Sequence, residues 1–324
     1  MKQLTVIIPF LNEKDEIEKT LQSIRNTAGY NVDILLINDA SYDGYDYRSV
    51  AIKYQAIYLE NEKRQGVARS RDIGIEQLDT DYFLIVDGHM RFYNNNWWNI
   101  IVNNLKNEER ALYYCRCKPL DSTLKIINRP SWGAYLELDG QETPHTILSP
   151  SWIRGDISPK EEILVTPCIL GACYAASRSY WLYLKGLSGL QMYGSDEAYI
   201  SIKVWLEGGY CILIKQIEIG HIFRDEFPYH INYPSLVFNK LLISETLLPT
   251  KFKVHVNNIL RKDEGIQLKE ATELLINYSK EVTLLRKYYK KMATRTFESF
   301  VEFNERVKRQ SDILLQQAKR EDSL

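Results

Sequence analysis

The chain has 324 residues, 45% of them hydrophobic and 26% charged, which is typical of a globular protein with one large or two modest domains. The 41 Lys and Arg residues almost balance the 42 Asp and Glu residues, so the charge predicts neither a nucleic-acid nor a membrane partner. Five cysteines, an odd number, argue against a disulfide framework, and we expect a protein of a reducing compartment, the cytoplasm. No apolar run approaches the roughly 20 residues that span a bilayer, and the N-terminus lacks a signal-peptide pattern.

The first part of the chain alternates predicted strands and helices. The helical segments carry apolar residues at helical spacing, for example Ile17, Leu21 and Ile24, whereas the strands are short apolar runs. Strands are predicted at 4–9, 32–37, 56–60 and 82–86, and helices at 14–26, 47–54 and 66–78. This alternation predicts an α/β fold with a mostly parallel sheet and helices on both faces.

Polar residues stand where three of these strands end: Asn12 and Glu13, then Asp39 and Asp43, then Asp87, Gly88 and His89. Ligands of open α/β sheets bind beyond the carboxyl ends of the strands. Asp87 and His89 are two residues apart, so an extended backbone points both to one side, where an oxygen and a nitrogen suit a divalent cation. A polar strand exit with a structural histidine is the alternative. The chain has neither a dinucleotide fingerprint nor a Walker loop that would explain the cluster.

The pattern weakens between residues 97 and 158, where we predict a loop-rich region. Its aromatic residues Trp132, Tyr135 and Trp152 either stand exposed to stack on a substrate or pack beneath long loops. Order returns with an apolar run at 166–174, a helix at 198–206 that Ser195 would cap, and a strand at 211–219 that ends before a second Gly-His pair.

After Pro234 the chain has few glycines and dense charge. Apolar residues at helical spacing over 268–289 and 293–319 predict an all-α C-terminal extension. We therefore divide the chain into domains at 1–233 and 234–324. The extension is a candidate surface for packing between subunits in a homo-oligomer, whereas its basic run at 286–291 is better explained as a solvated helix face.

Six motifs in chain order resemble the GT-A (Rossmann-like) glycosyltransferases, specifically family 2 and its relatives, the polypeptide N-acetylgalactosaminyltransferases. They are Val6 to Glu13, Leu36 to Gly44 (similar to VDDxSxDG), Gly66 to Gly74 (similar to GxxxARNxG), Asp87-Gly88-His89 (a DxH form of the metal motif), Tyr193 to Glu197 and Gly220 to Arg224 (close to GHVFR). The chain departs from the family pattern at Asn38, Ser70 and Asp72. The resemblance covers residues 4 to 225 and excludes the C-terminal helices.

The resemblance implies a nucleotide-sugar donor, most often a UDP-sugar, bound over the carboxyl ends of the first strands. It implies that Asp87, His89 and His221 bind Mn2+ (or Mg2+), which stabilises the negative charge on the departing diphosphate. For the base and ribose, the resemblance implies a pocket lined by Pro9, Phe10 and Glu13, with Asp39 bonding the uracil or ribose. Arg71 would lie near the base or phosphates, and Arg224 would add a cation to the phosphates. Gly88 would allow close approach to the backbone beside Asp87.

The resemblance also implies an acid that faces the acceptor, at Asp196, with Glu197 as the fallback. In an inverting reaction Asp196 would be the general base for the acceptor hydroxyl. The polypeptide transferases retain the anomeric configuration, and there the acid would position the substrate while the leaving phosphate accepts the proton. We predict inversion and keep retention as the alternative.

The acceptor is equally open between a glycan, a lipid-linked sugar and a peptide hydroxyl. Two other functions compete with glycosyl transfer. A nucleotidyltransferase would need a glycine-rich phosphate loop and a lysine near the first strand, and the sequence has neither there. A non-catalytic sugar-binding module would be expected to have lost part of the metal set, which is intact.

Overall fold

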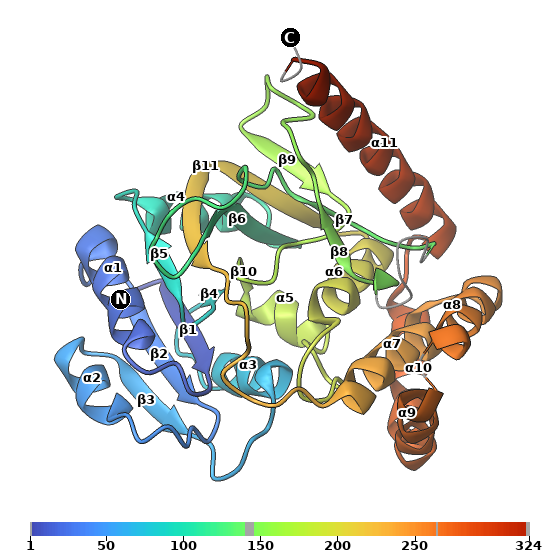
Figure 1. Ribbon diagram of the computed structural model, residues 1–324, viewed down its shortest axis with the longest axis horizontal. Coiled ribbons are helices and arrows are strands. Elements are labelled where there is room, and N and C mark those ends of the chain that lie inside the picture. Colours follow the sequence, from blue (N-terminus) through green and yellow to red (C-terminus); the bar gives the residue numbers. More distant parts are fainter. Residues whose placement is uncertain (1, 140–145, 264, 322–324) are drawn as a thin grey trace.

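A nine-stranded sheet runs through the molecule in the computed structural model, which describes residues 2–139, 146–263 and 265–321 (Figure 1). Its strand order is β3-β2-β1-β4-β10-β6-β11-β5, and β9 pairs with β11 outside this path. The first four strands are mutually parallel: β1 (Leu4–Phe10), β2 (Asp33–Asn38), β3 (Ile57–Glu60) and β4 (Tyr82–Val86). The predicted α/β fold with a mostly parallel sheet is confirmed.

Helices cover both faces of this sheet because its strands are apolar on both sides. The residues of β1 alternate between two buried clusters: Val6 and Ile8 pack with Ile17, whereas Ile7 packs with Ala68 and Ile75. The helices that follow the first three strands are α1 (Glu16–Ala28), α2 (Tyr47–Lys53) and α3 (Val67–Glu76), within two residues of the predicted bounds. Burial on both faces is what near-continuous apolar strands require.

The prediction of a loop-rich region was wrong for residues 97–120. This part forms α4 (Trp97–Asn107) and β6 (Ala111–Leu120), a central strand of the sheet, after the short β5 (Met90–Phe92). Ile101, Val102 and Leu105 are buried at helical spacing, but interspersed asparagines weaken the pattern in the sequence. Farther on, β7 (Ala134–Leu136) and β8 (Pro150–Trp152) form a separate two-stranded sheet between loops.

The second half of the sheet mixes strand directions. The apolar run predicted at 166–174 is split, because β9 (Ile163–Thr166) ends where it begins and β10 (Cys173–Ser177) starts near its end. After α5 (Arg178–Tyr183) and α6 (Asp196–Glu207), the long β11 (Tyr210–Ile222) lies parallel to β6, with a register shift between Ile214 and Glu218. Its start pairs with β9 and its end pairs with β5, so β11 reaches the carboxyl edge of the sheet.

Helices make up the described C-terminal part, as predicted: α7 (Tyr233–Leu247), α8 (Thr250–Asp263), α9 (Gly265–Asn277), α10 (Ser279–Met292) and α11 (Phe297–Glu321). They gather on one side of the molecule in Figure 1. Phe238, Leu285 and Phe300 belong to the same buried cluster as Phe83 and Ile85 of β4. The domain boundary at 233/234 stays a prediction. Among the described helices, none is long and apolar enough to cross a membrane.

Candidate active site

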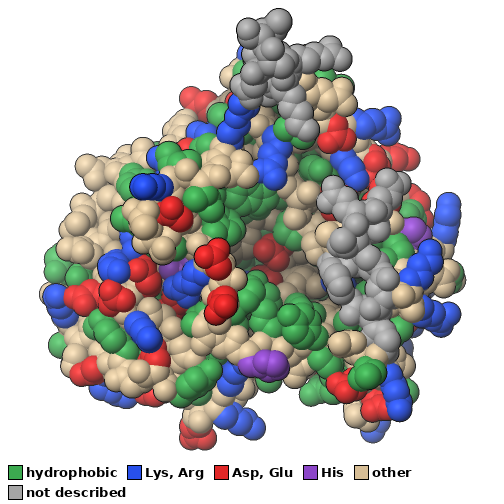
Figure 2. Space-filling model, in the orientation of Figure 1, with side chains coloured by type: hydrophobic (Ala, Val, Ile, Leu, Met, Phe, Trp, Pro, Cys, Tyr) green, Lys and Arg blue, Asp and Glu red, His purple; other side chains and the backbone are tan. Residues whose placement is uncertain are grey.

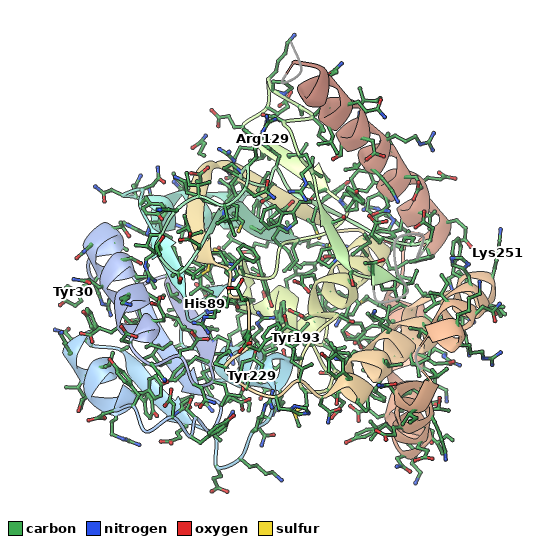
Figure 3. The ribbon with its side chains drawn as sticks, viewed as in Figure 1. Tyr30, His89, Arg129, Tyr193, Tyr229 and Lys251 are labelled. Atoms are coloured by element: carbon green, nitrogen blue, oxygen red, sulfur yellow. The ribbon has the colours of Figure 1, made fainter. Side chains whose placement is uncertain are left out.

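A cavity of about 380 Å³ opens at the carboxyl ends of the parallel strands. Figure 2 shows the hollow near the middle of one face, and Figure 3 places His89, Tyr193 and Tyr229 close together there, away from peripheral Tyr30 and Lys251. Every residue to which the sequence analysis assigned a role lines it: Pro9, Phe10, Glu13, Asp39, Arg71, Asp87, Gly88, His89, Asp196, Glu197, His221 and Arg224. Asn12 and Asp43, the other polar residues at the strand ends, are not among its lining residues. The structure thus brings the whole predicted set together, while the role of each residue stays a prediction.

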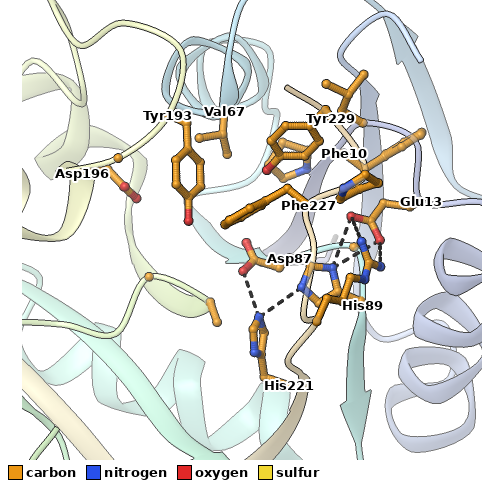
Figure 4. Close-up of a pocket in the computed structure, with 18 of the residues that line it drawn as sticks. Phe10, Glu13, Val67, Asp87, His89, Tyr193, Asp196, His221, Phe227 and Tyr229 are labelled. Carbon is orange, nitrogen blue, oxygen red and sulfur yellow. Dashed lines mark hydrogen bonds and ion pairs between the residues drawn. The ribbon is translucent and has the colours of Figure 1, made fainter. Parts of the chain in front are cut away.

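Asp87, His89 and His221 converge at the base of this cavity (Figure 4). Their candidate ligand atoms all lie within 4.8 Å of one another. Nε2 of His89 is 3.2 Å from Nε2 of His221, which is 3.4 Å from Oδ2 of Asp87. Neighbouring ligands at roughly 2.1 Å from one octahedral ion lie about 3 Å apart, so this spacing fits a divalent metal.

Strand pairing explains why residues so far apart in sequence meet. Asp87 directly follows β4, and its N–H donates to the carbonyl of Ala172. The end of β11 runs antiparallel to β5 with His221 opposite Met90, the residue after His89. The N–H of Ile222 also donates to the His89 carbonyl, 3.2 Å away. The fold therefore places both imidazoles beside the Asp87 carboxylate.

The pKa shifts of Asp87 and His221 favour the protonation states that a metal needs. Burial raises the pKa of Asp87, but the hydrogen bond from His221 and the charge of Arg71 together lower it well below its usual range. Burial lowers the pKa of His221, against the opposing effect of Asp87. A carboxylate and a neutral imidazole are the forms that bind cations. Nδ1 of His221 is buried with no hydrogen-bond partner among the described residues, so Nε2 is the nitrogen that its contacts direct toward Asp87 and His89.

Glu13 supports the cluster from behind His89. Both carboxylate oxygens lie 3.2 Å from Nδ1 of His89, and Arg224 holds the same carboxylate through two guanidinium nitrogens. Burial raises the pKa of Glu13, but His89 and Arg224 lower it to below its usual value, so it stays anionic. A carboxylate that accepts the other N–H of a metal-binding histidine fixes the ring and its tautomer. In this structure, therefore, Glu13 contacts His89 of the candidate metal cluster, and Arg224 contacts Glu13.

A Glu13→Gln variant is expected to bind Mn2+ about 10- to 100-fold more weakly, because such supporting partners usually contribute that much to metal affinity. Isothermal titration with Mn2+ alone measures the effect. Glu18→Gln in α1, whose side chain ends in a surface ion pair with Lys53, serves as the matched control. Equal Mn2+ affinities in wild type and Glu13→Gln would contradict the assignment.

Arg71 of α3 joins the candidate metal cluster, made of Asp87, His89 and His221, to the start of α6. Its guanidinium donates to Asp196, to Oδ1 of Asp87 at 3.3 Å and to the carbonyl of Gly171 at 3.3 Å, and its side chain is 5% exposed. Burial lowers the pKa of Arg71, but Tyr174, Asp196 and Asp87 raise it above its usual value, so it stays charged. One buried cation thus fixes two carboxylates of the cavity.

Asp196 and Glu197 begin α6 and both line the cavity. Ser195 stands at the N-cap position as predicted, but its side chain makes no capping hydrogen bond, and its φ of 66° turns the chain into the helix. Burial, and next the charge of Asp196, raise the pKa of Glu197 to about 8. The pair therefore combines an anchored carboxylate with a carboxyl group that holds a proton at neutral pH.

This protonated carboxyl predicts a specific pH dependence of stability. Between its ordinary pKa of 4.5 and its folded pKa of about 8, Glu197 keeps a proton that the unfolded chain releases, so unfolding free energy falls as pH rises through this window. In Glu197→Gln that contribution is absent, and its stability relative to wild type should rise from pH 4.5 to 8 and then level off. Urea unfolding without added metal measures this, with exposed Glu161→Gln as the control. Parallel stability curves for wild type and Glu197→Gln would rule it out.

Asp39 builds the end of the cavity beside the start of α3. Its carboxylate accepts hydrogen bonds from the N–H groups of Gln65 and Gly66 and from Nδ2 of Asn61, at 2.7 to 2.8 Å. It thereby fixes the turn that begins α3, and Gly66, with φ 89°, is packed against the backbone of Met192. A contact from Asp39 to uracil or ribose stays a prediction.

Sequence reasoning missed the aromatic side chains that close over the cavity. Tyr193 and Phe227 pack edge to face with ring centroids 5.5 Å apart, and Arg64 lies 4.9 Å from the Tyr229 ring. The cluster Phe227-Pro228-Tyr229, just beyond Arg224, was the signal that could have found two of them.

Of the three aromatic residues proposed for stacking, only Trp152 lines the described cavity. Trp132 lies under Arg116, whose guanidinium is 3.9 Å from the ring centroid, and Tyr135 is buried in a side cluster. Packing within the protein, the second of the two readings, therefore holds for Trp132 and Tyr135.

Comparisons with known proteins agree with this geometry. Residues 5–152 match the model of "Glycosyl transferase family 2". The chain is 25% identical over 240 residues to human polypeptide N-acetylgalactosaminyltransferase 14. It is also 25% identical over 247 residues to polypeptide N-acetylgalactosaminyltransferase 11 of Xenopus tropicalis. Each match covers 69% of this chain, whereas the chain spans only 41% and 39% of these relatives.

Two solved structures share the fold. A crystal structure of GalNAc-T7 with UDP, GalNAc and Mn2+ superposes with a TM-score of 0.72 at 18% identity, covering 93% of this chain and 56% of that one. S. aureus TarS residues 1–349 in complex with UDP-GlcNAc superposes with a TM-score of 0.51 at 14% identity, covering 80% of this chain and 70% of that one.

Proposed function

We propose that this protein is a metal-dependent glycosyltransferase that moves a sugar from a UDP-sugar to an acceptor hydroxyl, because residues 5–152 match the model of glycosyl transferase family 2 and the chain shares its fold with GalNAc-T7. The observation that carries the proposal is the meeting of Asp87, His89 and His221 in the cavity, with Glu13 behind His89. GalNAc-T7, which shares the fold, binds UDP and Mn2+, and Mn2+ suits the donor set here, with Mg2+ as the alternative ion.

The residues of the chain divide the work of the reaction. Asp87, His89 and His221 would hold the cation, which supplies positive charge for the departing diphosphate. Glu13 orients His89, and Arg224, which lines the same cavity, keeps Glu13 anionic. The aromatic side chains above, among them Tyr193 and Phe227, would exclude water from the sugar–phosphate bond.

The stereochemical outcome that we propose is retention, in place of the inversion predicted from the sequence. The curated relatives reported above are polypeptide N-acetylgalactosaminyltransferases, the retaining group named in the resemblance. In the structure one oxygen of Asp196 is already engaged by Arg71, which suits an acid that positions substrate better than a free general base. The leaving phosphate would then take the proton of the acceptor hydroxyl.

The acceptor, the cellular location and self-association of the protein are also proposals. The relatives favour a peptide or glycan hydroxyl as the acceptor over a lipid-linked sugar. The five described cysteines are all free and buried, in keeping with a cytoplasmic, reducing location. Association through the C-terminal helices, like the nucleotidyltransferase and sugar-binding alternatives, has no observation in its favour.

A donor screen tests the proposal. Hydrolysis of UDP-GalNAc, UDP-GlcNAc, UDP-glucose and GDP-mannose should be followed with and without Mn2+, because it needs no acceptor. We expect Mn2+-dependent release of UDP from at least one donor, and thermal stabilisation by UDP only when Mn2+ is present. Proton NMR of the released sugar then separates retention from inversion. Absence of both UDP release and Mn2+-linked stabilisation would overturn the glycosyltransferase assignment.

A further inference from the structure

Two asparagines of the C-terminal helices are fully buried and bonded to backbone far away in the sequence. Asn239 of α7 and Asn304 of α11 are both 0% exposed. A buried amide must satisfy its donors and acceptor, and each of these uses them on segments of the catalytic half of the chain. The first segment, bonded by Asn304, pairs with the strand that carries Trp152, and the second, bonded by Asn239, contains Met192, Tyr193 and Gly194, which line the cavity.

Asn304 completes the edge of the small sheet. Its Nδ2 donates to the Leu136 carbonyl and its Oδ1 accepts from the Leu136 N–H, both at 2.8 Å, as a neighbouring strand would do. On its other side β7 pairs with β8, with Leu136 opposite Pro150 and Ala134 opposite Trp152. Asn304 therefore fixes the strand pair that presents Trp152 to the cavity.

Further contacts hold α11 against this strand pair, which it flanks in Figure 1. Phe303 stacks on Trp205 of α6 with centroids 4.9 Å apart, and Lys308 bonds Glu137 at 2.8 Å. Trp152 in turn meets Phe223 edge to face at 5.8 Å, and Phe223 packs 4.3 Å from the ring of His221. A continuous series of contacts thus links α11 to the metal cluster.

Asn239 holds the second segment, residues 191–194. Its Nδ2 lies within 3.2 Å of the carbonyls of Gln191, Tyr193 and Gly194, and its Oδ1 accepts from the Gln191 N–H at 2.8 Å. This segment is conformationally demanding, because Met192, Gly194 and Ser195 have φ of 49°, 96° and 66°. Such backbone persists only where its surroundings hold it, and it leads straight into Asp196.

We propose that Asn239 and Asn304 are positioning residues, through which the C-terminal helices hold the two walls of the cavity that face the sugar and the acceptor. The inference rests on the proposed function, because only that function assigns these walls to the sugar and the acceptor. Asp39, Phe10 and Gly66 mark the nucleotide end beside β1 and β2, whereas Trp152 and Phe223 lie on the β11 side of the sheet order. The helices thereby act on the reaction without touching substrate.

Crossed substitutions test the proposal, with Leu chosen because it keeps the size of Asn and removes its hydrogen bonds. Asn239→Leu should lower kcat for Mn2+-dependent UDP-sugar hydrolysis by about 10- to 100-fold, as expected for small misplacement of a catalytic wall. The Kd of Mn2+ should stay at the wild-type value, because Asn239 bonds Gln191, Tyr193 and Gly194 and not Asp87, His89 or His221, whereas a general loss of structure would weaken Mn2+ binding.

Asn304→Leu is instead read out at Trp152 by fluorine NMR of protein labelled with 5-fluorotryptophan. The chain has six tryptophans, and Trp152→Phe assigns the signal. We expect this resonance to shift or broaden in Asn304→Leu and to stay unchanged in Asn239→Leu. Asn258→Leu, at an exposed position of α8, is the matched control for both measurements.

The hydrolysis and NMR measurements distinguish failure of the proposed function from failure of the positioning proposal. A wild-type protein that hydrolyses no donor argues against the proposed function, while the Trp152 resonance still decides the role of Asn304. An unchanged resonance in Asn304→Leu, or unchanged kcat in Asn239→Leu, overturns the positioning proposal. Where a Leu variant does not fold, Asn239→Asp and Asn304→Asp, which keep an acceptor and lose the donor, are expected to show the same effects at smaller size.

Discussion

Asp87→Asn is expected to lower Mn2+-dependent sugar transfer or donor hydrolysis by about 10³-fold or more, since charge stabilisation by a bound cation contributes several kcal/mol. The substitution keeps the shape of the side chain and an oxygen ligand but removes the negative charge that two imidazoles and Arg71 surround. The rate of UDP release at saturating Mn2+ measures the loss.

The same variant should also lose the Mn2+-linked stabilisation by UDP. Its matched control is Asp33→Asn at the start of β2, where the carboxylate makes a surface ion pair with Lys2 and activity should be unaffected. A variant that kept a tenth of wild-type activity would show that the metal site does not depend on Asp87.

Arg71→Met is expected to destabilise the fold by roughly 3–5 kcal/mol, because it leaves the buried carboxylate of Asp196 and the partly buried carboxylate of Asp87 without their cation. Both Asp87 and Asp196 bond this guanidinium, and its side chain is almost fully enclosed. The free energy of unfolding from urea titration without added metal measures the loss. The prediction concerns stability, so it can be checked whatever the substrate proves to be.

Second-site and control variants make this result specific. Adding Asp196→Asn to Arg71→Met should recover part of the stability, because a neutral amide needs no counter-charge. Arg69→Met removes a guanidinium from the same helix, but its partner Glu76 is half exposed, so the expected loss is below about 1 kcal/mol. Equal losses at Arg69 and Arg71 would mean that the buried ion pairs do not carry the effect.

Local sequence patterns predicted the first part of the fold well, because there the spacing of apolar residues matches the strands and helices that form. The strands before Asp39 and Asp87 are continuous apolar runs, and parallel strands bring their carboxyl ends to one edge. Grouping Asp39, Asp87 and His89 in one site followed from that rule alone. Adding His221 and Asp196 needed the family resemblance, since each joins the site through pairing over a long sequence distance.

Other features had no local signal. α4 and β6 were missed because polar residues interrupt their apolar pattern. The contact of Glu13 with His89, and the bridge from Arg71 to Asp196, depend on side chains that meet only after the sheet is assembled. Asn239 and Asn304 look like ordinary helix residues in the sequence, and their role is visible only in the backbone that they bond.

The pairing of β11 with β5 gives the metal cluster a meaning for folding as well as for chemistry. His89 and His221 are 132 residues apart and meet only after β11 has joined the sheet. Chain closure over such a distance is slow and entropically costly, so this contact belongs among the last to form. At a free concentration of the proposed ion equal to 100 times its Kd, ion binding would stabilise the native state by about 2.7 kcal/mol relative to any form in which β11 is detached. Binding of the ion would then require that β11 has joined the sheet, and it would stabilise the sheet in that state.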